Sequence, residues 1–296
     1  MSSFTFSGSL AGRTVARVGF GAMQLPGPGV LGPPRDRDEA LAVLRRAVEL
    51  GVDHIDTAQF YGPDVANELI HEALHPYPED LLLVSKVGSQ RDAEGGWHPA
   101  QSPAALRAGV EDNLRSLEVE QLGAVNLRRM HEHGLSESDT FSLEDQLAEL
   151  VALRDEGKIG GIGISTAPLA EVEQAIATAG IVCVQNAFSL VDRSDADVLA
   201  ACRAAGVAYV PYFPLGSAFP HLPKVVDQPA VQAVAARLDA TPAQVGLAWL
   251  LAHDESILLI PGTSSVAHLE DNVAVGDLVL SAADVAELDA ATAPTA

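Results

Sequence analysis

Residues 54–62 read His-Ile-Asp-Thr-Ala-Gln-Phe-Tyr-Gly, and this stretch sets the interpretation of the whole chain. Gly51 ends a helical pattern, and β-branched residues then alternate with polar ones up to Asp56, which predicts a short strand that stops at this carboxylate. A phenol follows at Tyr61, and Lys86 ends the next apolar run. The sequence therefore predicts three ionisable groups around one end of a sheet.

These three groups suit acid/base chemistry. A phenol is a poor proton donor at neutral pH, but a neighbouring ammonium stabilises its phenolate form, and Lys86 can do this for Tyr61. A partly buried lysine keeps its charge most easily beside a carboxylate, which Asp56 supplies. The alternative for Tyr61 is an aromatic side chain that only packs over the edge of the fold.

Composition and length favour one large soluble domain. The 296 residues are 48% hydrophobic and 20% charged, which is enough apolar material for a large core, and α/β barrels of this length form one domain, here residues 1–296. The longest apolar runs, such as residues 245–252, are far shorter than a membrane span, and the N-terminus lacks the pattern of a signal peptide. We therefore expect a cytoplasmic enzyme.

Charge and cysteine content exclude several classes of partner. A net charge of −22 repels phosphates, so we expect neither nucleic acid nor an anionic membrane as partner. Cys183 and Cys202 lie in apolar surroundings without metal-ligand spacing, which indicates buried, reduced thiols.

Strands and helices alternate along the chain after a short N-terminal β-hairpin, predicted on either side of residues 11–13. The predicted strands are 16–21, 52–55, 81–86, 122–127, 160–164, 181–185, 207–211 and 256–260. The predicted helices are 38–50, 64–75, 102–117, 143–157, 168–179, 194–205, 228–238 and 242–252. Eight such repeats favour a closed (β/α)₈ TIM barrel, an α/β fold, over an open parallel sheet.

An open sheet that binds a dinucleotide would carry a glycine-rich loop between its first strand and helix. Gly19 and Gly21 supply two of the glycines, but the third is missing and no helix follows at once, which disfavours that fold. In a barrel, site residues come from the carboxyl ends of several strands. The residues at or just beyond such ends are Asp56, Lys86, Arg128, Ser165, Gln185 and Tyr212.

The pattern Asp-Thr-Ala-x-x-Tyr-Gly at residues 56–62, with Lys86 ending the third strand, resembles the aldo-keto reductase superfamily over almost the whole chain. The resemblance implies a barrel that reduces an aldehyde or ketone with NADP(H), NAD(H) being a possible substitute. It assigns catalytic roles to Asp56, Tyr61 and Lys86, with hydride from the nicotinamide and the proton from Tyr61. No metal is required, and the partner is a small carbonyl substrate.

The same resemblance implies a set of cofactor-binding residues. Ser165 and Gln185 would contact the nicotinamide carboxamide, and Tyr212 would stack on its ring. Residues 260–272 resemble the segment that holds the adenosine and its 2′-phosphate. The remaining implied contacts are Gly21, Ala22, Met23, Pro214, Leu215, Gly216, Gly262, Thr263, Ser264, His268, Asp271 and Asn272.

Two positions depart from the family pattern. Many members end the fourth strand with a catalytic histidine, whereas alignment here gives Arg128, either a catalytic residue or part of a structural ion pair, with His131 three residues later. NADP-specific members often carry Lys and Arg where this chain has Gly262 and His268. Hydroxyl groups and a following helix N-terminus can still bind a phosphate, so we expect a preference for NADPH.

Residues 21–30, 32–37, 125–128 and 261–269 are similar to those of bacterial pyridoxal reductase-like members, the pyridoxine 4-dehydrogenases, which suggests an aromatic aldehyde such as pyridoxal. We expect residues 24–37 and 213–224 to wall the substrate pocket. The oligomeric state stays open, with a monomer possible.

Other functions compete with this one. Lys86 could form a Schiff base, as in aldolase-type barrels, if desolvation freed its amine. The chain could also be a non-catalytic subunit that binds the cofactor. The cluster His131-Glu132-His133 has no third metal ligand at a recognisable spacing, and we predict surface positions for His71, His75 and His98.

Overall fold

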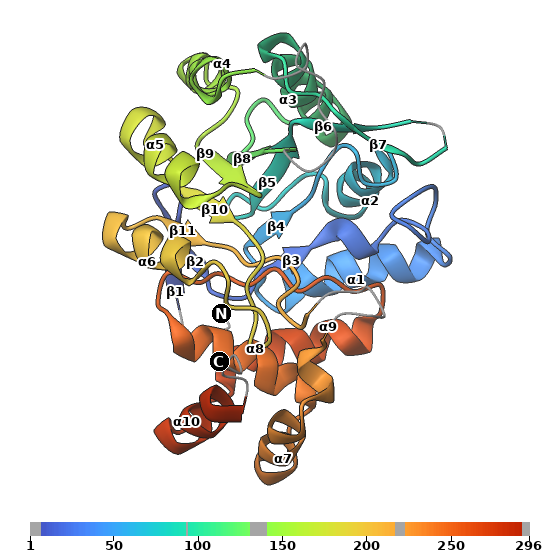
Figure 1. Ribbon diagram of the computed structural model, residues 1–296. Helices are drawn as coiled ribbons and strands as arrows, with labels where there is room; N and C mark the ends of the chain where they lie inside the picture. Colours follow the sequence, from blue (N-terminus) through green and yellow to red (C-terminus); the bar gives the residue numbers. More distant parts are fainter. Residues whose placement is uncertain (1–6, 93, 131–140, 217–222, 292–296) are drawn as a thin grey trace.

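Seven parallel strands form one sheet in the computed structural model, which describes residues 7–92, 94–130, 141–216 and 223–291 (Figure 1). The order across the sheet is β11-β10-β9-β8-β5-β4-β3. The strands are β3 (Phe20–Gly21), β4 (His54–Asp56), β5 (Leu82–Val87), β8 (Ala124–Arg128), β9 (Ile162–Ser165), β10 (Cys183–Gln185) and β11 (Ala208–Tyr209).

The segment predicted as the eighth strand closes this sheet into a barrel. Ile257 pairs with Tyr209 on one side, and Leu259 pairs with Val18 on the other, both in parallel. Gly19 N donates to Leu259 O at 2.8 Å. The barrel predicted from the sequence is thereby confirmed, although the predicted strand 16–21 keeps regular pairing only at its end.

Helices surround the barrel, and the eight predicted ones are present within a few residues (Figure 1). They are α1 (Arg37–Glu49), α2 (Val65–Leu74), α3 (Pro103–Leu117), α4 (Leu143–Asp155), α5 (Leu169–Ala179), α6 (Ala196–Ala205), α7 (Pro229–Leu238) and α8 (Pro242–His253). Two further helices are α9 (Val266–Val273), which the sequence implied only as a helix N-terminus after the hydroxyl groups of residues 263–265, and α10 (Ala282–Ala291), which was not predicted. None of the described helices is long and apolar enough to cross a membrane.

Side-chain caps explain where several helices begin. Asp36, Ser102 and Ser142 each accept a hydrogen bond from the backbone N–H three residues later, at the starts of α1, α3 and α4. Thr241 and Gln244 form a capping box at the start of α8. A short polar residue in front of an apolar periodic run therefore marks the start of each of these helices.

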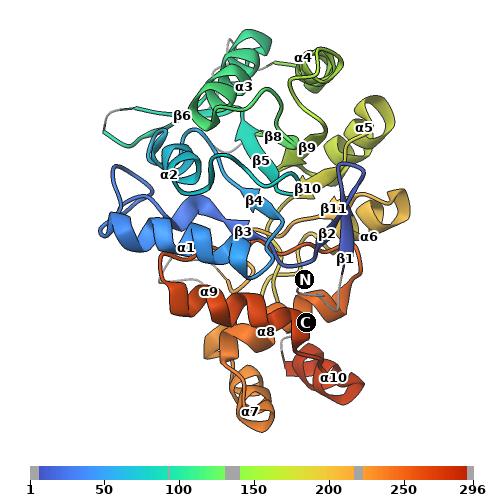
Figure 2. The same ribbon diagram turned by 180° about the vertical axis from the view of Figure 1, so that it is seen from behind.

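The N-terminal hairpin closes one end of the barrel. Strands β1 (Ser7–Leu10) and β2 (Arg13–Ala16) turn at residues 11–12, as predicted, whereas the predicted residues 4–6 lie outside the described part. Leu10 and Val15 pack with Leu82 and Leu258 at the amino ends of the barrel strands. Figure 2, seen from behind, shows this hairpin lying beside β11. The open end is therefore the carboxyl end of the strands.

A second hairpin, which the sequence did not predict, follows β5. Its strands β6 (Ser89–Arg91) and β7 (Trp97–Pro99) are antiparallel, with Arg91 opposite Trp97. The sequence between these strands is rich in glycine and polar residues, so its pairing is not visible as apolar alternation. Because it starts three residues after Lys86, this hairpin lies next to the open end of the barrel.

Candidate active site

Strand alternation places the predicted site residues on the inside of the barrel. Leu82 and Val84 belong to the cluster that fills the barrel interior, and Lys86 is the next residue of the same parity on β5. On β8, Arg128 lies four residues after Ala124, a member of the same cluster, and therefore points to the same side of its strand. Both cationic side chains therefore extend toward the open mouth rather than toward the helices.

Asp56, Lys86 and Gln185 form one buried hydrogen-bonded group. Lys86 Nζ donates to Asp56 Oδ1 and, at 3.2 Å, to the carbonyl oxygen of Thr57. The second carboxylate oxygen, Asp56 Oδ2, accepts from Gln185 Nε2 at 2.6 Å. The exposed fractions are 4% for Asp56, 7% for Lys86 and 2% for Gln185, so these contacts are shielded from water.

Tyr61 lies against this group. Lys86 Nζ is 5.1 Å from the centroid of the Tyr61 ring, and the tyrosine is 5% exposed. Burial alone would lower the pKa of Lys86, but the charge of Asp56, with a smaller contribution from Tyr61, outweighs it and raises the pKa. Lys86 is therefore a fixed ammonium next to a phenol, the arrangement that the sequence predicted.

A polar network behind the strands holds the residues next to this trio. Thr57 Oγ1 donates to Asn67 Oδ1 at 2.8 Å, and Asn67 Nδ2 donates to Asn113 Oδ1 at 2.9 Å. Ser85 Oγ donates to the same Asn113 oxygen at 2.6 Å. All four side chains are fully buried. The network connects the residue after Asp56 to the residue before Lys86 through helices α2 and α3, which fixes the two strand ends relative to each other.

Arg128 faces an aromatic cluster. Its guanidinium carbon is 4.9 Å from the centroid of the Trp97 ring, and that of Arg91 is 4.2 Å from the same ring. Trp97 packs edge-on against Phe60, which packs edge-on against Tyr61. No carboxylate in the described ranges lies within ion-pair distance of Arg128. Arg128 is thus held by a cation–π contact, and the structural ion pair that the sequence left open is not seen there.

The loop after β3 is tied to the same region. Arg91 donates to the carbonyl oxygens of Gly29 and Val30 at 3.2 Å each, and Gly62 N donates to Val30 O at 3.1 Å. The predicted wall 24–37 therefore lies against the residue after Tyr61. Of the second predicted wall, residues 217–222 lie outside the described part, and Gly216 pairs with Lys224 across that gap.

The residues predicted for the nicotinamide are neighbours in the sheet. Ser165 pairs with Gln185 across β9 and β10, and both are buried. No described residue donates to Gln185 Oε1, and the Ser165 hydroxyl lies 3.4 Å from the hydroxyl of Thr166. Tyr212 follows β11, is half-buried and packs edge-on against Phe213. One hydroxyl, one amide oxygen and one flat ring therefore line the same edge.

The predicted cofactor segments from the two ends of the chain touch through their backbones. A Cβ at Gly21 would lie 2.5 Å from Ile260 O, and a Cβ at Gly262 would lie 2.5 Å from Gly21 O, so both positions require glycine. Beside them Ala22 is buried and Met23 is half-buried, in the 3₁₀ helix η1 (Ala22–Gln24). The contact brings residues 241 positions apart to one side of the barrel mouth.

The segment predicted to hold the adenosine is more exposed. Thr263 is buried and accepts from Ser265 N at 3.1 Å, just before α9. The backbone N–H of Val266, in the first turn of α9, donates to Glu39 Oε1 at 3.0 Å. A carboxylate from α1 therefore already accepts one of the backbone N–H groups at the helix N-terminus that the sequence predicted as a phosphate site.

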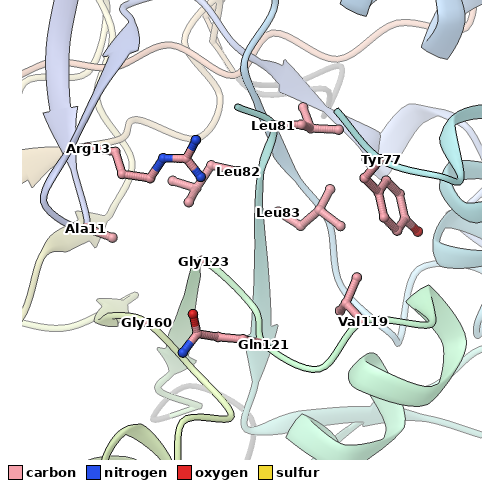
Figure 3. A pocket seen from close by; sticks show the side chains of 10 residues that line it. All are labelled: Ala11, Arg13, Tyr77, Leu81, Leu82, Leu83, Val119, Gln121, Gly123 and Gly160. Carbon is pink, nitrogen blue, oxygen red and sulfur yellow. The ribbon is translucent and has the colours of Figure 1, made fainter. Parts of the chain in front are cut away.

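The other predicted cofactor residues fall into two groups. Half-buried ones are Pro214, Leu215, Gly216 and Asn272. Exposed ones are Gly262, Ser264, His268 and Asp271. His131 lies outside the described residues. The cavity in Figure 3, of about 200 Å³, contains none of these residues, because it lies at the amino ends of the strands beside Arg13, Tyr77 and Gly160.

Sequence reasoning missed Trp97, Asn67, Asn113 and Glu39. The two asparagines had a usable signal, because each stands on the apolar face of a predicted helix, where asparagine is unfavourable without a partner. Glu39 had none, since its partner is 227 residues away.

The fold and this site define an aldo/keto reductase, and comparison with known proteins gives the same class. The Aldo/keto reductase family profile matches residues 17–293, so the chain belongs to this family of oxidoreductases. It is 48% identical over 291 residues to the pyridoxine 4-dehydrogenase of Escherichia coli strain K12, covering 98% of each chain.

Solved structures share the fold. An aldo-keto reductase from Klebsiella pneumoniae in complex with NADPH superposes with a TM-score of 0.81 at 24% identity, covering 98% of this chain and 96% of that one. The glycerol dehydrogenase of Gluconobacter oxydans superposes with a TM-score of 0.82 at 20% identity, covering 99% and 96%. At these identities the comparison establishes the barrel and its connections.

Proposed function

We propose that this protein reduces an aromatic aldehyde of the pyridoxal class to the alcohol, with NADP(H) as cofactor and Tyr61 as the proton donor. The observation that carries the proposal is the buried contact of Lys86 with Asp56, 5.1 Å from the Tyr61 ring centroid. A phenol becomes a useful acid where the phenolate it leaves behind is stabilised, and the adjacent ammonium provides that stabilisation.

The residues at the barrel mouth fit a nicotinamide cofactor, which supplies a hydride when it is bound. A carboxamide needs one acceptor and one donor, and Gln185 Oε1 and the Ser165 hydroxyl offer them side by side. The half-buried Tyr212 presents an aromatic ring for stacking. The Klebsiella pneumoniae relative that binds NADPH has the same fold, which supports this choice.

Each residue of the trio has its own task. Tyr61 gives its proton to the oxygen of the carbonyl group as that oxygen gains charge. Lys86 keeps its charge throughout because Asp56 raises its pKa, so it stabilises the phenolate that remains. Asp56 holds Lys86 and is itself held by Gln185. Arg128 donates to the carbonyl oxygen or to a polar ring substituent.

The substrate class follows from the walls and from the relative. Phe60 is fully buried between Tyr61 and Trp97, and the half-buried Trp97 is the ring of this cluster that an aromatic substrate can contact, a contact that an aliphatic aldehyde makes less well. The pyridoxine 4-dehydrogenase of Escherichia coli, at 48% identity, acts on a pyridine derivative by its name, which supports pyridoxal or a close analogue.

The Schiff-base function is not favoured. A lysine that attacks a carbonyl must be a free amine, which requires a lowered pKa. Asp56 instead raises the pKa of Lys86. A non-catalytic subunit would not need Asp56, Tyr61 and Lys86 in this arrangement, so their presence favours an enzyme.

We also propose a cytoplasmic location. Cys183 and Cys202 are both free and buried, and burial raises the pKa of each thiol to about 12, so neither is poised for disulfide exchange. Because neither cysteine forms a disulfide, this pair does not require an oxidising compartment.

A panel of aldehydes tests the function. Purified protein is mixed with NADPH or NADH and with pyridoxal, benzaldehyde or an aliphatic aldehyde of similar size, and nicotinamide absorbance is followed. We expect multiple turnovers with NADPH and the highest kcat/KM for pyridoxal. Turnover limited to the aliphatic aldehyde would reject the substrate class, and no multiple turnover with any carbonyl compound would reject the reductase.

A further inference from the structure

Two imidazoles and a carboxylate meet on the outside of the barrel, away from the reductase site. His71 lies in the last turn of α2, and His75 caps the same helix four residues later, so the two rings lie on one face. Glu118 caps the neighbouring helix α3. One ligand atom from each of these three residues lies within 4.8 Å of the other two. The sequence predicted surface positions for both histidines, but His71 is partly buried.

The contact between His71 and Glu118 has the spacing of a metal chelate. His71 Nε2 lies 3.3 Å from Glu118 Oε2, but the atoms are not aligned for a hydrogen bond. His71 Nε2 is also a buried nitrogen without a hydrogen-bond partner among the described residues. Two ligands bound to tetrahedral zinc at about 2.0–2.1 Å are about 3.3–3.4 Å apart, with lone pairs directed at the ion and not at each other.

We propose that His71, His75 and Glu118 bind a divalent transition-metal ion, with zinc as the best match. Two imidazoles and one carboxylate are a donor set that zinc accepts, and water can complete the coordination. The His71 and His75 rings are 4.8 Å apart between centroids and tilted by 35°, and His75 is exposed, so in the proposed site the His75 ring turns from this arrangement to direct a nitrogen at the ion. Glu118, with a side chain 64% exposed, leaves an entry path.

The site is structural and not hydrolytic. Zinc hydrolases with His-Glu-x-x-His use the glutamate as general base, and residues 71–75 have this spacing. Here Glu72 forms an ion pair with Arg37 of α1, on the other side of α2 from Glu118, so it is not directed at the ion. The metal instead joins the ends of α2 and α3 at the amino-terminal side of β5. We therefore expect it to raise thermal stability without changing turnover.

Zinc titration of the intact protein tests the site. Protein without a histidine tag is treated with EDTA, exchanged into chelator-free buffer and titrated with ZnCl₂ in a calorimeter. We expect wild type to bind one more equivalent of zinc than His71→Ala, His75→Ala or Glu118→Gln, or to bind that equivalent at least about tenfold more tightly, since each variant removes one ligand. His98→Ala is the matched control, because it removes an exposed histidine that also contacts a carboxylate, Asp92.

A second readout separates binding from folding. Zinc should raise the melting temperature of wild type and of His98→Ala but not of the three ligand variants, because an ion stabilises only the protein that binds it. Circular dichroism and turnover without zinc should be equal in all five proteins. The proposal is overturned if wild type binds no zinc below millimolar concentration, or if the three ligand variants bind it as wild type does. Unchanged affinity in Glu118→Gln alone would remove the carboxylate from the site.

Discussion

The two ends of the proposed cofactor site are built in opposite ways. At the reacting end, Asp56, Lys86 and Gln185 come from three strands, are buried, and Asp56 accepts a hydrogen bond from each of the other two. At the adenosine end, the contacts are a backbone approach at Gly262 and a carboxylate, Glu39, at the first turn of α9. We therefore expect the barrel to fix the catalytic geometry, and surface charges, which can change without disturbing that geometry, to decide between NADPH and NADH.

The largest effect should follow from removing the buried cation. Lys86→Met leaves the Asp56 carboxylate buried and unpaired, which should lower the free energy of unfolding by about 3–5 kcal/mol and abolish turnover. Urea unfolding and steady-state kinetics measure the two effects. Lys158→Met is the control, because it removes two ion pairs at the surface, with Glu111 and Glu156, and should change both quantities little.

The double variant Asp56→Asn with Lys86→Met sharpens this prediction. It removes both charges, so stability should recover part of the loss while turnover stays absent. Equal stability of the single and double variants would contradict the account of an uncompensated carboxylate.

Tyr61→Phe should keep the fold and lose the chemistry. The variant retains the ring against Phe60 but has no proton to give, so kcat should fall by on the order of a hundredfold or more, with cofactor affinity nearly unchanged. Tyr212→Phe removes a hydroxyl from the same mouth and should leave kcat near that of wild type. Retention of most kcat in Tyr61→Phe would reject the acid assignment.

Some parts of the site could be predicted from the sequence, and others could not. Asp56, Lys86 and Gln185 each end an apolar strand, and a barrel brings such ends together, so local patterns sufficed. Trp97 lies in a hairpin without apolar alternation, and its contacts with Phe60 and Arg128 depend on tertiary packing. The family resemblance implied a helix N-terminus near residue 265, but the eight residues of α9 are too few for a periodic pattern to give the bounds of that helix.

The family resemblance aligns Arg128 with a position where many members have a histidine, which gives a prediction for the pH profile. Arginine does not titrate near neutrality, and the raised pKa of Lys86 removes that group from this range as well. The kcat for reduction should therefore show no ionisation between about pH 6 and 7, the range in which imidazole changes charge. Arg128→His should introduce one, with a moderate loss of rate.

Two outcomes would change the role given to Arg128. A wild-type ionisation in that range that His131→Ala abolishes would make His131 the residue that acts in the site. An unchanged rate and profile in Arg128→Ala would restrict Arg128 to packing against Trp97.

The smallest effect concerns Glu39 and bears directly on the adenosine end. Its carboxylate accepts the Val266 N–H and puts a negative charge where the 2′-phosphate of NADPH should bind, at the N-terminus of α9. Glu39→Gln keeps an acceptor oxygen for Val266 and removes only the charge. A charge at a helix end contributes about 0.3–1 kcal/mol, so the ratio of NADPH to NADH affinity should rise by about two- to fivefold in a fluorescence titration.

Asp38→Asn is the matched control, since it removes a neighbouring charge in the first turn of α1 that makes no hydrogen bond or ion pair with α9 among the described residues. The effect should shrink at high salt, because exposed charges are screened. Equal ratios in Glu39→Gln and wild type at low salt would mean that the phosphate is bound elsewhere along residues 263–272, and tighter binding of NADH than NADPH by wild type would show that Glu39 already decides the choice against the phosphate.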